Sequence, residues 1–276
     1  MEKAIQFVKE NKGFTILLVL AALILLLALL GPVIAWEDPT YSDMGSAFQA
    51  PSLSHLCGTD RLGRDVLSRV IYGTRVSVPS ALILVLIILV VGTILGIVAG
   101  YFGGWVDTVI MRIADMMISF PGMVLAIAVA GIMGASIQNA IIALAVVSWT
   151  KYARLARSLV LKIRHEDYVY AAVTTGSKVL YILRQYMLPN VLPTLVITAT
   201  TDIGAMMLEL AGLSFLGFGA QPPIPEWGLM LNEGRQYITA YPWLILFQGL
   251  AIAIVVSIFN LLGDSLRDIL DPRSVR

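Results

Sequence analysis

Six apolar segments run along the chain, separated by stretches that hold most of its charged residues. They are Phe14–Ile34, Val78–Tyr101, Asp107–Met133, Ile137–Lys151, Val191–Phe218 and Trp243–Gly263. About 20 apolar residues cross the hydrocarbon core of a bilayer as a helix, which satisfies its own backbone hydrogen bonds in lipid. The pattern therefore predicts an all-α membrane protein with six transmembrane helices, of which the fourth is the shortest.

Composition supports a membrane protein and removes several other classes. Hydrophobic residues make up 58% of the chain and charged residues 13%, whereas a soluble domain carries about 25% charge. Cys57 is the only cysteine, so an intrachain disulfide is excluded. His55 and His165 lie outside the apolar segments and in no H-E-x-x-H pattern. We expect lipid around the chain, no metal site and no nucleic-acid partner.

The distribution of Lys and Arg predicts the orientation. If the chain starts in the cytoplasm, 14 of its 19 Lys and Arg residues fall on the cytoplasmic side, as the positive-inside rule requires. Both termini are then cytoplasmic. The first apolar run is longer than a signal-peptide core and lacks a small-x-small cleavage site, so we interpret it as an uncleaved span. The chain divides into residues 1–35, an extracytoplasmic segment 36–77 and a core 78–276 with a cytoplasmic loop 152–190.

An amphipathic helix is predicted between the first two spans, over Gly58–Val78, with Asp60 as its cap. Two opposite-charge pairs, Asp60/Arg64 and Asp65/Arg69, are spaced four residues apart on one face. The other face carries the apolar residues Leu62, Val66, Leu67, Val70 and Ile71. We expect this helix to lie in the outer interface. Alternatively, Arg61 and Arg64 contact an anion or substrate.

A charged island, Asp167–Pro193, separates the fourth and fifth spans. A helix that starts at Tyr168 places mostly small residues on one stripe, namely Ala171, Ala172, Thr175, Gly176 and Val179. Pro189 and Pro193 disfavour helical angles at the residues before them, so the chain is expected to turn there. The stripe admits close approach either by another protein or by the chain's own helices.

The fifth span contains two acidic residues, Asp202 and Glu209, seven positions apart on one face. Thr198, Ala205 and Met206 share this face. A charge at the bilayer centre costs about 3 kcal/mol or more, so such groups usually face a bundle interior or a water path. We interpret Thr198, Asp202, Met206 and Glu209 as a translocation pathway suited to a cationic substrate, such as a metal complex or a peptide amino group. The alternative is a structural carboxylate that contacts a partner subunit.

The island resembles the cytoplasmic EAA loop of ABC importer permeases, E-A-A-x3-G-x9-I-x-L-P. The matching residues are Tyr170-Ala171-Ala172, Gly176 and Tyr186-x-Leu188-Pro189, with Tyr170 in place of Glu and Tyr186 in place of Ile. The resemblance implies that a helix here sits in a cleft of an ATPase subunit. The coupling residues would be Tyr168, Ala171, Ala172, Thr175, Gly176, Val179, Leu188 and Pro189.

Three longer blocks are similar to the C-type permease of dipeptide, oligopeptide and nickel importers. They are GTDRLGRDVLSR (58–69), AGLSFLGFGAQPPIPEWGLMLNEGR (211–235) and NLLGDSLRDILDPR (260–273). The resemblance implies a type I ABC importer permease fold in a bacterial plasma membrane. It also implies three kinds of protein partner: a second homologous permease, two ATPase subunits and an extracytoplasmic substrate-binding protein.

The chain itself has no phosphate-binding loop of the form G-x-x-x-x-G-K-[ST], and no Gly-Lys dipeptide occurs in it. We therefore expect no cofactor and no catalytic residue here, with ATP bound and hydrolysed by the partner subunits. Two other classes of membrane protein make different demands on the sequence. An ion-gradient-driven secondary transporter could use Asp202 and Glu209, but it predicts a repeated half that is not evident. An intramembrane enzyme needs a nucleophile and a base, and no such constellation is present.

Overall fold

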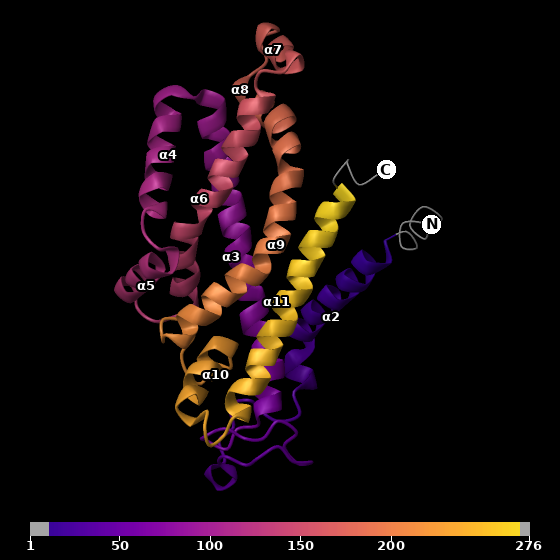
Figure 1. Ribbon diagram of the computed structural model, residues 1–276, viewed down its shortest axis with the longest axis vertical. Coiled ribbons are helices and arrows are strands. Elements are labelled where there is room, and N and C mark those ends of the chain that lie inside the picture. The colour runs from indigo at the N-terminus through magenta and orange to yellow at the C-terminus, as the bar shows by residue number, and fades with distance from the viewer. Residues whose placement is uncertain (1–10, 271–276) are drawn as a thin grey trace.

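The computed structural model describes residues 11–270, which fold into a bundle of long helices (Figure 1). The helices are α2 (Lys12–Ile34), α3 (Val66–Phe102), α4 (Gly104–Ile118), α5 (Gly122–Met133), α6 (Ile137–Ile163), α7 (Asp167–Thr174), α8 (Val179–Ile182), α9 (Leu188–Phe215), α10 (Trp227–Gly234) and α11 (Trp243–Leu270). Three short turns complete them, η1 (Met44–Ser46), the π-helical η2 (Leu183–Met187) and η3 (Arg235–Tyr237). These described residues form no strand and only one isolated bridge, Thr59 to Asp65.

Four of the predicted spans are long, apolar helices. They are α2, α3, α11 and the continuous stretch Val179–Phe215 that includes α9. The predicted third span is broken, because α4 and α5 meet at a bend of 93°. Pro121 lies at this break, where its ring leaves no N–H for a helical hydrogen bond. The fourth, α6, has 27 residues and is charged in its second half. The six-span count stays a prediction.

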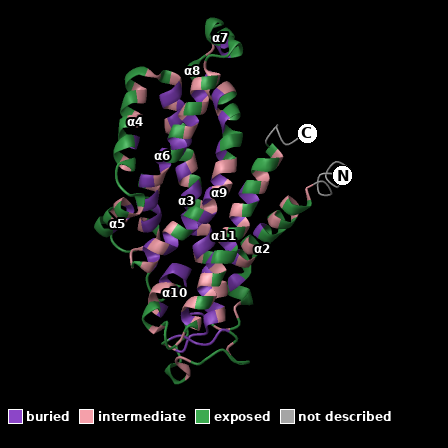
Figure 2. Cartoon of the chain, viewed as in Figure 1, coloured by how far each residue is buried: buried purple, intermediate pink, exposed green. Residues whose placement is uncertain are grey.

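Glycines on α3 let α6 approach closely, and this is the most extensive helix contact in the described chain. Gly92, Gly96 and Gly100 follow one another at intervals of four, which places them on one face. A Cβ atom on Gly96 would lie 2.4 Å from the carbonyl oxygen of Ala153 on α6. Buried residues are accordingly most frequent along α3 and α6, whereas α4, α5 and α7 have more exposed residues (Figure 2).

The predicted amphipathic helix over 58–78 is wrong in its first part. Residues 58–65 form a loop, and α3 begins only at Val66, where Asp65 accepts a hydrogen bond from the Ser68 N–H at 2.7 Å. Asp60 does not cap this helix. Its carboxylate closes a turn by accepting from the N–H groups of Leu62 and Arg64 at 2.8 and 3.0 Å. A side chain that satisfies its own loop in this way competes with helix formation.

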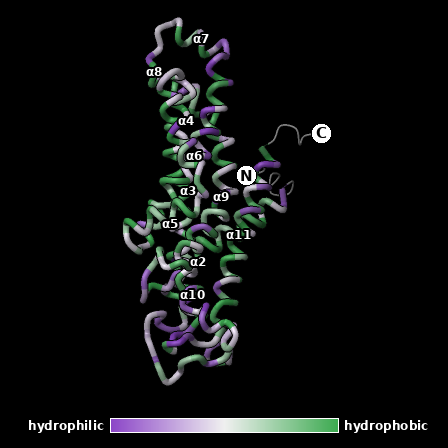
Figure 3. The backbone as a smooth tube through the Cα atoms, turned by 60° about the vertical axis from the view of Figure 1, so that its left-hand side comes forward, coloured by the Kyte–Doolittle hydropathy of each residue, from purple (hydrophilic) through white to green (hydrophobic). Residues whose placement is uncertain are grey.

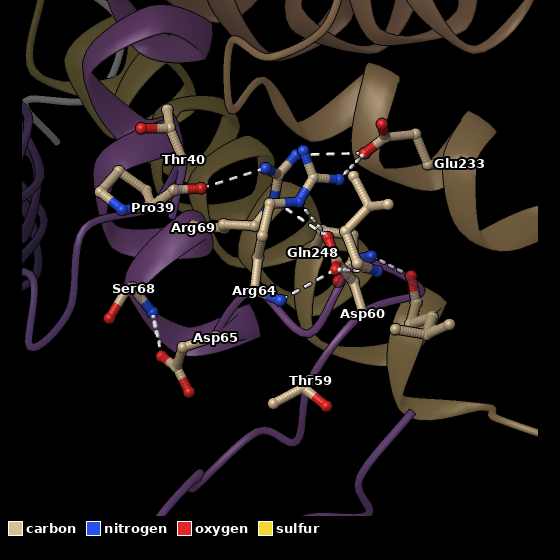
Figure 4. Close-up of polar contacts among 12 residues, drawn as sticks. Pro39, Thr40, Thr59, Asp60, Arg64, Asp65, Ser68, Arg69, Glu233 and Gln248 are labelled. Atoms are coloured by element: carbon tan, nitrogen blue, oxygen red, sulfur yellow. Dashed lines mark hydrogen bonds and ion pairs between the residues drawn. The ribbon is translucent and has the colours of Figure 1, made fainter. Parts of the chain in front are cut away.

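The arginines of this segment are buried in a charge cluster rather than exposed to water. Arg64 pairs with Asp60 at 2.6 Å, as the spacing predicts, but Arg69 pairs with Glu233 of α10 at 3.1 Å. Glu233 also receives Arg64 at 3.0 Å, so one carboxylate oxygen joins both guanidinium groups (Figure 4). Arg69 is 1% exposed. The predicted pairing of Arg69 with Asp65 is wrong, since Asp65 contacts His55 at 3.1 Å instead.

A second buried carboxylate fastens α10 to α3. Glu226 caps α10 by accepting from the N–H groups of Gly228 and Leu229 at 2.9 and 2.8 Å, and it receives the Ser77 hydroxyl at 3.2 Å. Burial raises the pKa of Glu226, and these hydrogen bonds partly oppose the shift. Residues 35–65, between α2 and α3, are called the outer segment below because they are predicted to lie outside the cytoplasm. This segment and α10 form one polar end of the molecule, where hydrophilic residues concentrate (Figure 3).

The chain does not turn at its two Leu-Pro steps, contrary to the prediction. Pro189 lies in the first turn of α9 and Pro193 lies inside it. Proline is tolerated in a first turn because its missing N–H has no helical partner there. The π turn Leu183–Met187 comes immediately before, and the Leu188 N–H bonds back to the Leu183 carbonyl. The island therefore leads into the fifth span as a nearly continuous helix.

Candidate functional site

The short helix α7 projects at one end of the molecule, opposite the outer segment (Figure 1). Its inner side is anchored by Val169 and Ala172. Together with Ile182 and Met187, they are buried in the main apolar cluster of the bundle, to which α3, α5, α6 and α9 also contribute. The two sides of α7 thus differ: one packs against the bundle and the other is exposed. The apolar anchor fixes the position of α7 and leaves its other face to solvent or to a partner.

Gly176 ends α7, so the predicted helix Tyr168–Val179 is too long. Gly176 has a φ of +78°, the left-handed conformation that favours glycine. Its N–H bonds to the Val173 carbonyl and the next N–H, of Ser177, bonds to the Ala172 carbonyl, which is the Schellman pattern. Val179 lies past this stop, in α8. The predicted single stripe therefore does not form, and Ala172 faces inward.

The remaining predicted coupling residues lie at the surface. Tyr168, Ala171, Thr175, Gly176, Val179 and Pro189 are exposed, and Leu188 is half-buried. They lie among larger apolar side chains, including Leu180, which is 76% exposed. We call the exposed set Tyr168, Tyr170, Val173, Leu180 and Tyr181 the α7–α8 face. The ring of Tyr186 lies 5.7 Å from that of Tyr168 and 6.0 Å from that of Tyr181.

Tyr170 occupies the position where the EAA pattern has Glu. Its hydroxyl lies 3.0 Å from Nδ1 of His165, and the Arg164 Nε donates to the other ring nitrogen of His165 at 3.3 Å. Arg164 in turn donates to the carbonyl of Gly100, at the end of α3, at 3.0 Å. A chain of hydrogen bonds therefore connects α7 with the end of α6 and with α3.

The predicted pathway residue Asp202 is paired within the chain. The ammonium group of Lys151 lies 2.7 and 2.9 Å from its two carboxylate oxygens, and the Tyr152 hydroxyl donates to it at 2.9 Å. Asp202 is buried, while the Lys151 side chain is 59% exposed. Sequence reasoning missed Lys151 because it closes the fourth apolar run. The signal in the sequence is a single Lys at the end of the fourth apolar run and a single Asp inside the fifth, two opposite charges that could pair.

The other three predicted pathway residues have different surroundings. Thr198 bonds its hydroxyl to the Thr194 carbonyl at 2.9 Å, and Met206 is buried in the main apolar cluster. Glu209 is half-buried and forms no ion pair with another residue of the described chain. Asp202 and Met206 are therefore packed inside the bundle, whereas Thr198 and Glu209 are only partly buried.

Further ion pairs attach α4 to α6, on the side of Lys151 toward α7. Arg154 pairs with Asp115 at 2.6 Å, and Arg157 pairs with Asp107 through both carboxylate oxygens. These contacts account for most of the charge on the second half of α6. Within residues 11–270, no group of three or more His, Cys, Asp or Glu residues is placed to bind a metal ion.

Comparison with known proteins agrees with this arrangement. Residues 92–276 match the family described as binding-protein-dependent transport system inner membrane component. The chain is 42% identical to the dipeptide transport system permease protein DppC of Alkalihalophilus pseudofirmus, over 98% of this chain and 89% of that protein. It is 41% identical to the nickel transport system permease protein NikC of Escherichia coli, over 98% and 97%.

The fold also has a solved counterpart. A structure of inward-facing conformations of the MetNI methionine ABC transporter superimposes with a TM-score of 0.60 at 19% identity, covering 74% of this chain and 98% of that one. At this identity the likeness concerns the fold alone. Together with the family match and the relatives above, it leads to one assignment: the chain belongs to the binding-protein-dependent transport system inner membrane components, as a permease of the dipeptide and nickel ABC importer type.

Proposed function

We propose that this chain forms half of the translocation pathway of an ATP-driven importer in a bacterial plasma membrane. The substrate is a small peptide or nickel, free or chelated. The other half is a second homologous permease, two ATPase subunits bind and hydrolyse the ATP, and an extracytoplasmic protein delivers the substrate. In this arrangement the α7 end faces the cytoplasm and the outer segment faces the opposite side.

The observation that carries the proposal is the exposed α7–α8 face. Tyr170 and Tyr181 are 51% and 53% exposed there, yet the charged side chains of Lys178 and Arg184 lie in the same segment. Hydrocarbon disfavours such charges, so lipid is a poor cover for this face. An exposed apolar patch rimmed by polar residues is typical of a protein interface. An ATPase subunit that holds this face would move α7 and, through it, α6 and α9.

The test is a charge placed on this face. Val173→Asp is expected to reduce co-purification of the ATPase subunits and ATP-dependent uptake together, because Val173 is 50% exposed and the carboxylate would lose water on docking. The matched control is Leu53→Asp, the same type of change at a side chain 98% exposed in the outer segment. Leu53→Asp should retain the ATPase subunits. Full ATPase retention and uptake in Val173→Asp would contradict the proposal.

A gradient-driven transporter makes a different prediction for the purified assembly. Its uptake would follow an imposed ion gradient without ATP and would not need the α7–α8 face. The ion pair between Lys151 and Asp202 argues against Asp202 as its coupling group, since a coupling carboxylate must exchange its ion or proton and Asp202 is already neutralised, and leaves Glu209 as the other group named for that mechanism. Uptake into proteoliposomes with ATP alone, and with a gradient alone, separates the two mechanisms.

A further inference from the structure

A polar pocket of about 260 Å³ lies at the end of α9 that is farthest from α7. The loop after α9, the helix α10 and the turn η3 surround it, and the outer segment contributes Arg61. The polar side chains that line it include Arg61, Gln221, Asn232, Gln236 and Tyr237. None of them belongs to the α7–α8 face or to the Lys151–Asp202 pair, and the proposed coupling does not use them.

Arg61 determines the charge that a ligand would meet in this pocket. Glu233 also lines the pocket, but its carboxylate is held by Arg64 and Arg69, and Asp60 pairs with Arg64 (Figure 4). These two acids and two bases cancel. Arg61 is exposed and forms no ion pair within the described residues. A guanidinium group in this state presents a planar pair of donors that matches a carboxylate.

The amide side chains of the pocket offer acceptors. The Gln221 nitrogen donates to the carbonyls of Gly219 and Ala220, each at 3.1 Å, and the Asn232 nitrogen donates to the carbonyl of Phe215. These bonds engage the nitrogens and leave the side-chain oxygens of Gln221 and Asn232 able to accept from a ligand, and the second carboxylate oxygen of Glu233, Oε1, also has no hydrogen-bond partner among the described residues. The pocket therefore combines one cation that can bind a carboxylate with several acceptors for N–H groups.

We infer that this pocket receives the C-terminal end of a short peptide. Arg61 binds the terminal carboxylate, and the side-chain oxygens of Gln221 and Asn232 accept hydrogen bonds from peptide N–H groups. The inference rests on the proposed function and selects the peptide among its substrates, since the pocket offers no cluster of metal ligands. Its volume is below the range of about 300–1,000 Å³ typical of sites for drug-sized ligands, which suits a ligand of two or three residues.

The test compares a dipeptide with its C-terminal amide. The complete transporter is reconstituted with its binding protein, and ATP-dependent uptake of each labelled peptide is measured below saturation. Arg61→Gln should lower uptake of the free acid by about tenfold and leave uptake of the amide unchanged, because only the acid has a charge for Arg61 to bind. Both permease variants receive peptide from the same binding protein, so a change in the acid-to-amide ratio originates in this chain.

The control is Arg235→Gln, which removes the same charge from an exposed arginine that lies over the ring of Phe215, 5.7 Å from its centroid, and does not line the pocket. This variant should keep the wild-type ratio. A second measurement avoids the binding protein, so it is valid even when that protein does not bind the amide. A photo-reactive dipeptide is cross-linked to the purified transporter without the binding protein, with unlabelled acid or amide as competitor. In the wild-type transporter, unlabelled acid should prevent cross-linking of the photo-reactive dipeptide and the amide should not. In Arg61→Gln, cross-linking should be lost.

The outcomes separate this inference from the proposed function. If the wild-type assembly takes up no peptide and no nickel with ATP, the proposed function fails. If it takes up peptide and Arg61→Gln keeps the wild-type ratio and the wild-type capture, only the pocket inference is overturned. Equal loss for acid and amide also overturns it, because such a loss reports a structural role for Arg61. Uptake of nickel without any peptide overturns it as well.

Discussion

The Lys151 ammonium group lies 2.7 Å from the Asp202 carboxylate, across the contact between α6 and α9. Asp202 is buried, and the Tyr152 hydroxyl supplies a second donor to it. The carboxylate is therefore neutralised and hydrogen-bonded inside the bundle, which is how a charge buried among apolar helices becomes tolerable. The pair also connects the helix before the α7–α8 face to the helix after it.

Substitution of Lys151 and Asp202, singly and together, should measure the free energy of their interaction. Asp202→Ala leaves the Tyr152 hydroxyl without its acceptor and is expected to lower the free energy of unfolding by about 1–3 kcal/mol. Lys151→Met keeps an apolar side chain and leaves the buried carboxylate without its counter-ion. A double-mutant cycle on thermal unfolding of the detergent-solubilised protein should give a coupling of about 1 kcal/mol, since Lys151 is partly exposed. Strictly additive effects would contradict a direct interaction.

The glycine face of α3 should tolerate no added methyl group. In Gly96→Ala the new Cβ would meet the Ala153 carbonyl oxygen at 2.4 Å, so α3 and α6 must separate, at a cost of about 1–3 kcal/mol. Gly249→Ala is the matched control, because that helical glycine of α11 has open space around its Cβ direction. It should leave stability unchanged or raise it by up to about 1 kcal/mol. Equal melting temperatures for the two variants would contradict close packing at Gly96.

The Cys57 thiol should react slowly with alkylating reagents, and its ionisation at alkaline pH should destabilise the folded protein. Burial, helped by the negative charge of Asp65, raises the pKa of Cys57 above its ordinary value of 9.0. Alkylation of the folded protein should therefore keep accelerating above pH 9, while the denatured chain behaves as an ordinary thiol. The raised pKa contributes stability that is complete below pH 9.0 and is lost as the pH rises through the folded-state value.

Cys57→Ala provides the control for this pH dependence, because it removes the titrating group and keeps a small apolar side chain. The difference in melting temperature between wild type and Cys57→Ala should shift against the wild type above pH 9. A constant difference between pH 7 and pH 10 would show that Cys57 does not titrate with a raised pKa.

Gly176 should resist substitution for a backbone reason alone. No atom lies within 4 Å of its Cβ direction, but its φ of +78° costs a non-glycine residue about 1–2 kcal/mol. Asn adopts this conformation more easily than a β-branched residue. Hydrogen exchange of the α7 amides should therefore quicken in the order wild type, Gly176→Asn, Gly176→Val. Slower exchange in Gly176→Val than in Gly176→Asn would contradict this reason.

Long apolar runs are predictable because they depend on local composition. The predicted starts of the first and last spans, Phe14 and Trp243, fall within two residues of the observed starts of α2 and α11. The sequence did not predict the break near Pro121, because the third apolar run has the length of one span and a single proline inside it does not by itself indicate two helices. The Leu-Pro steps failed for the opposite reason: the rule for the residue before proline is local, while the π turn before α9 supplies a different hydrogen-bond pattern.

The charged contacts were the least predictable features because they connect distant parts of the sequence. Arg69 meets Glu233 and Lys151 meets Asp202, and in both cases spacing rules favoured nearer partners or none. The predicted surface of the island was only partly right. Helical spacing placed Ala171 and Ala172 together, whereas the structure exposes Ala171 and buries Ala172, because the short α7 rests on the bundle.

The three glycines that join α3 to α6 also determine how a displacement would travel. Two helices in such close contact from Gly92 to Gly100 can neither slide nor twist past each other without a clash. A force applied to one end of α6 would then tilt both helices together, as a single stiff lever. The pair would therefore carry a displacement along its whole length, whereas the chain after α3 changes direction by 93° between α4 and α5, next to Pro121.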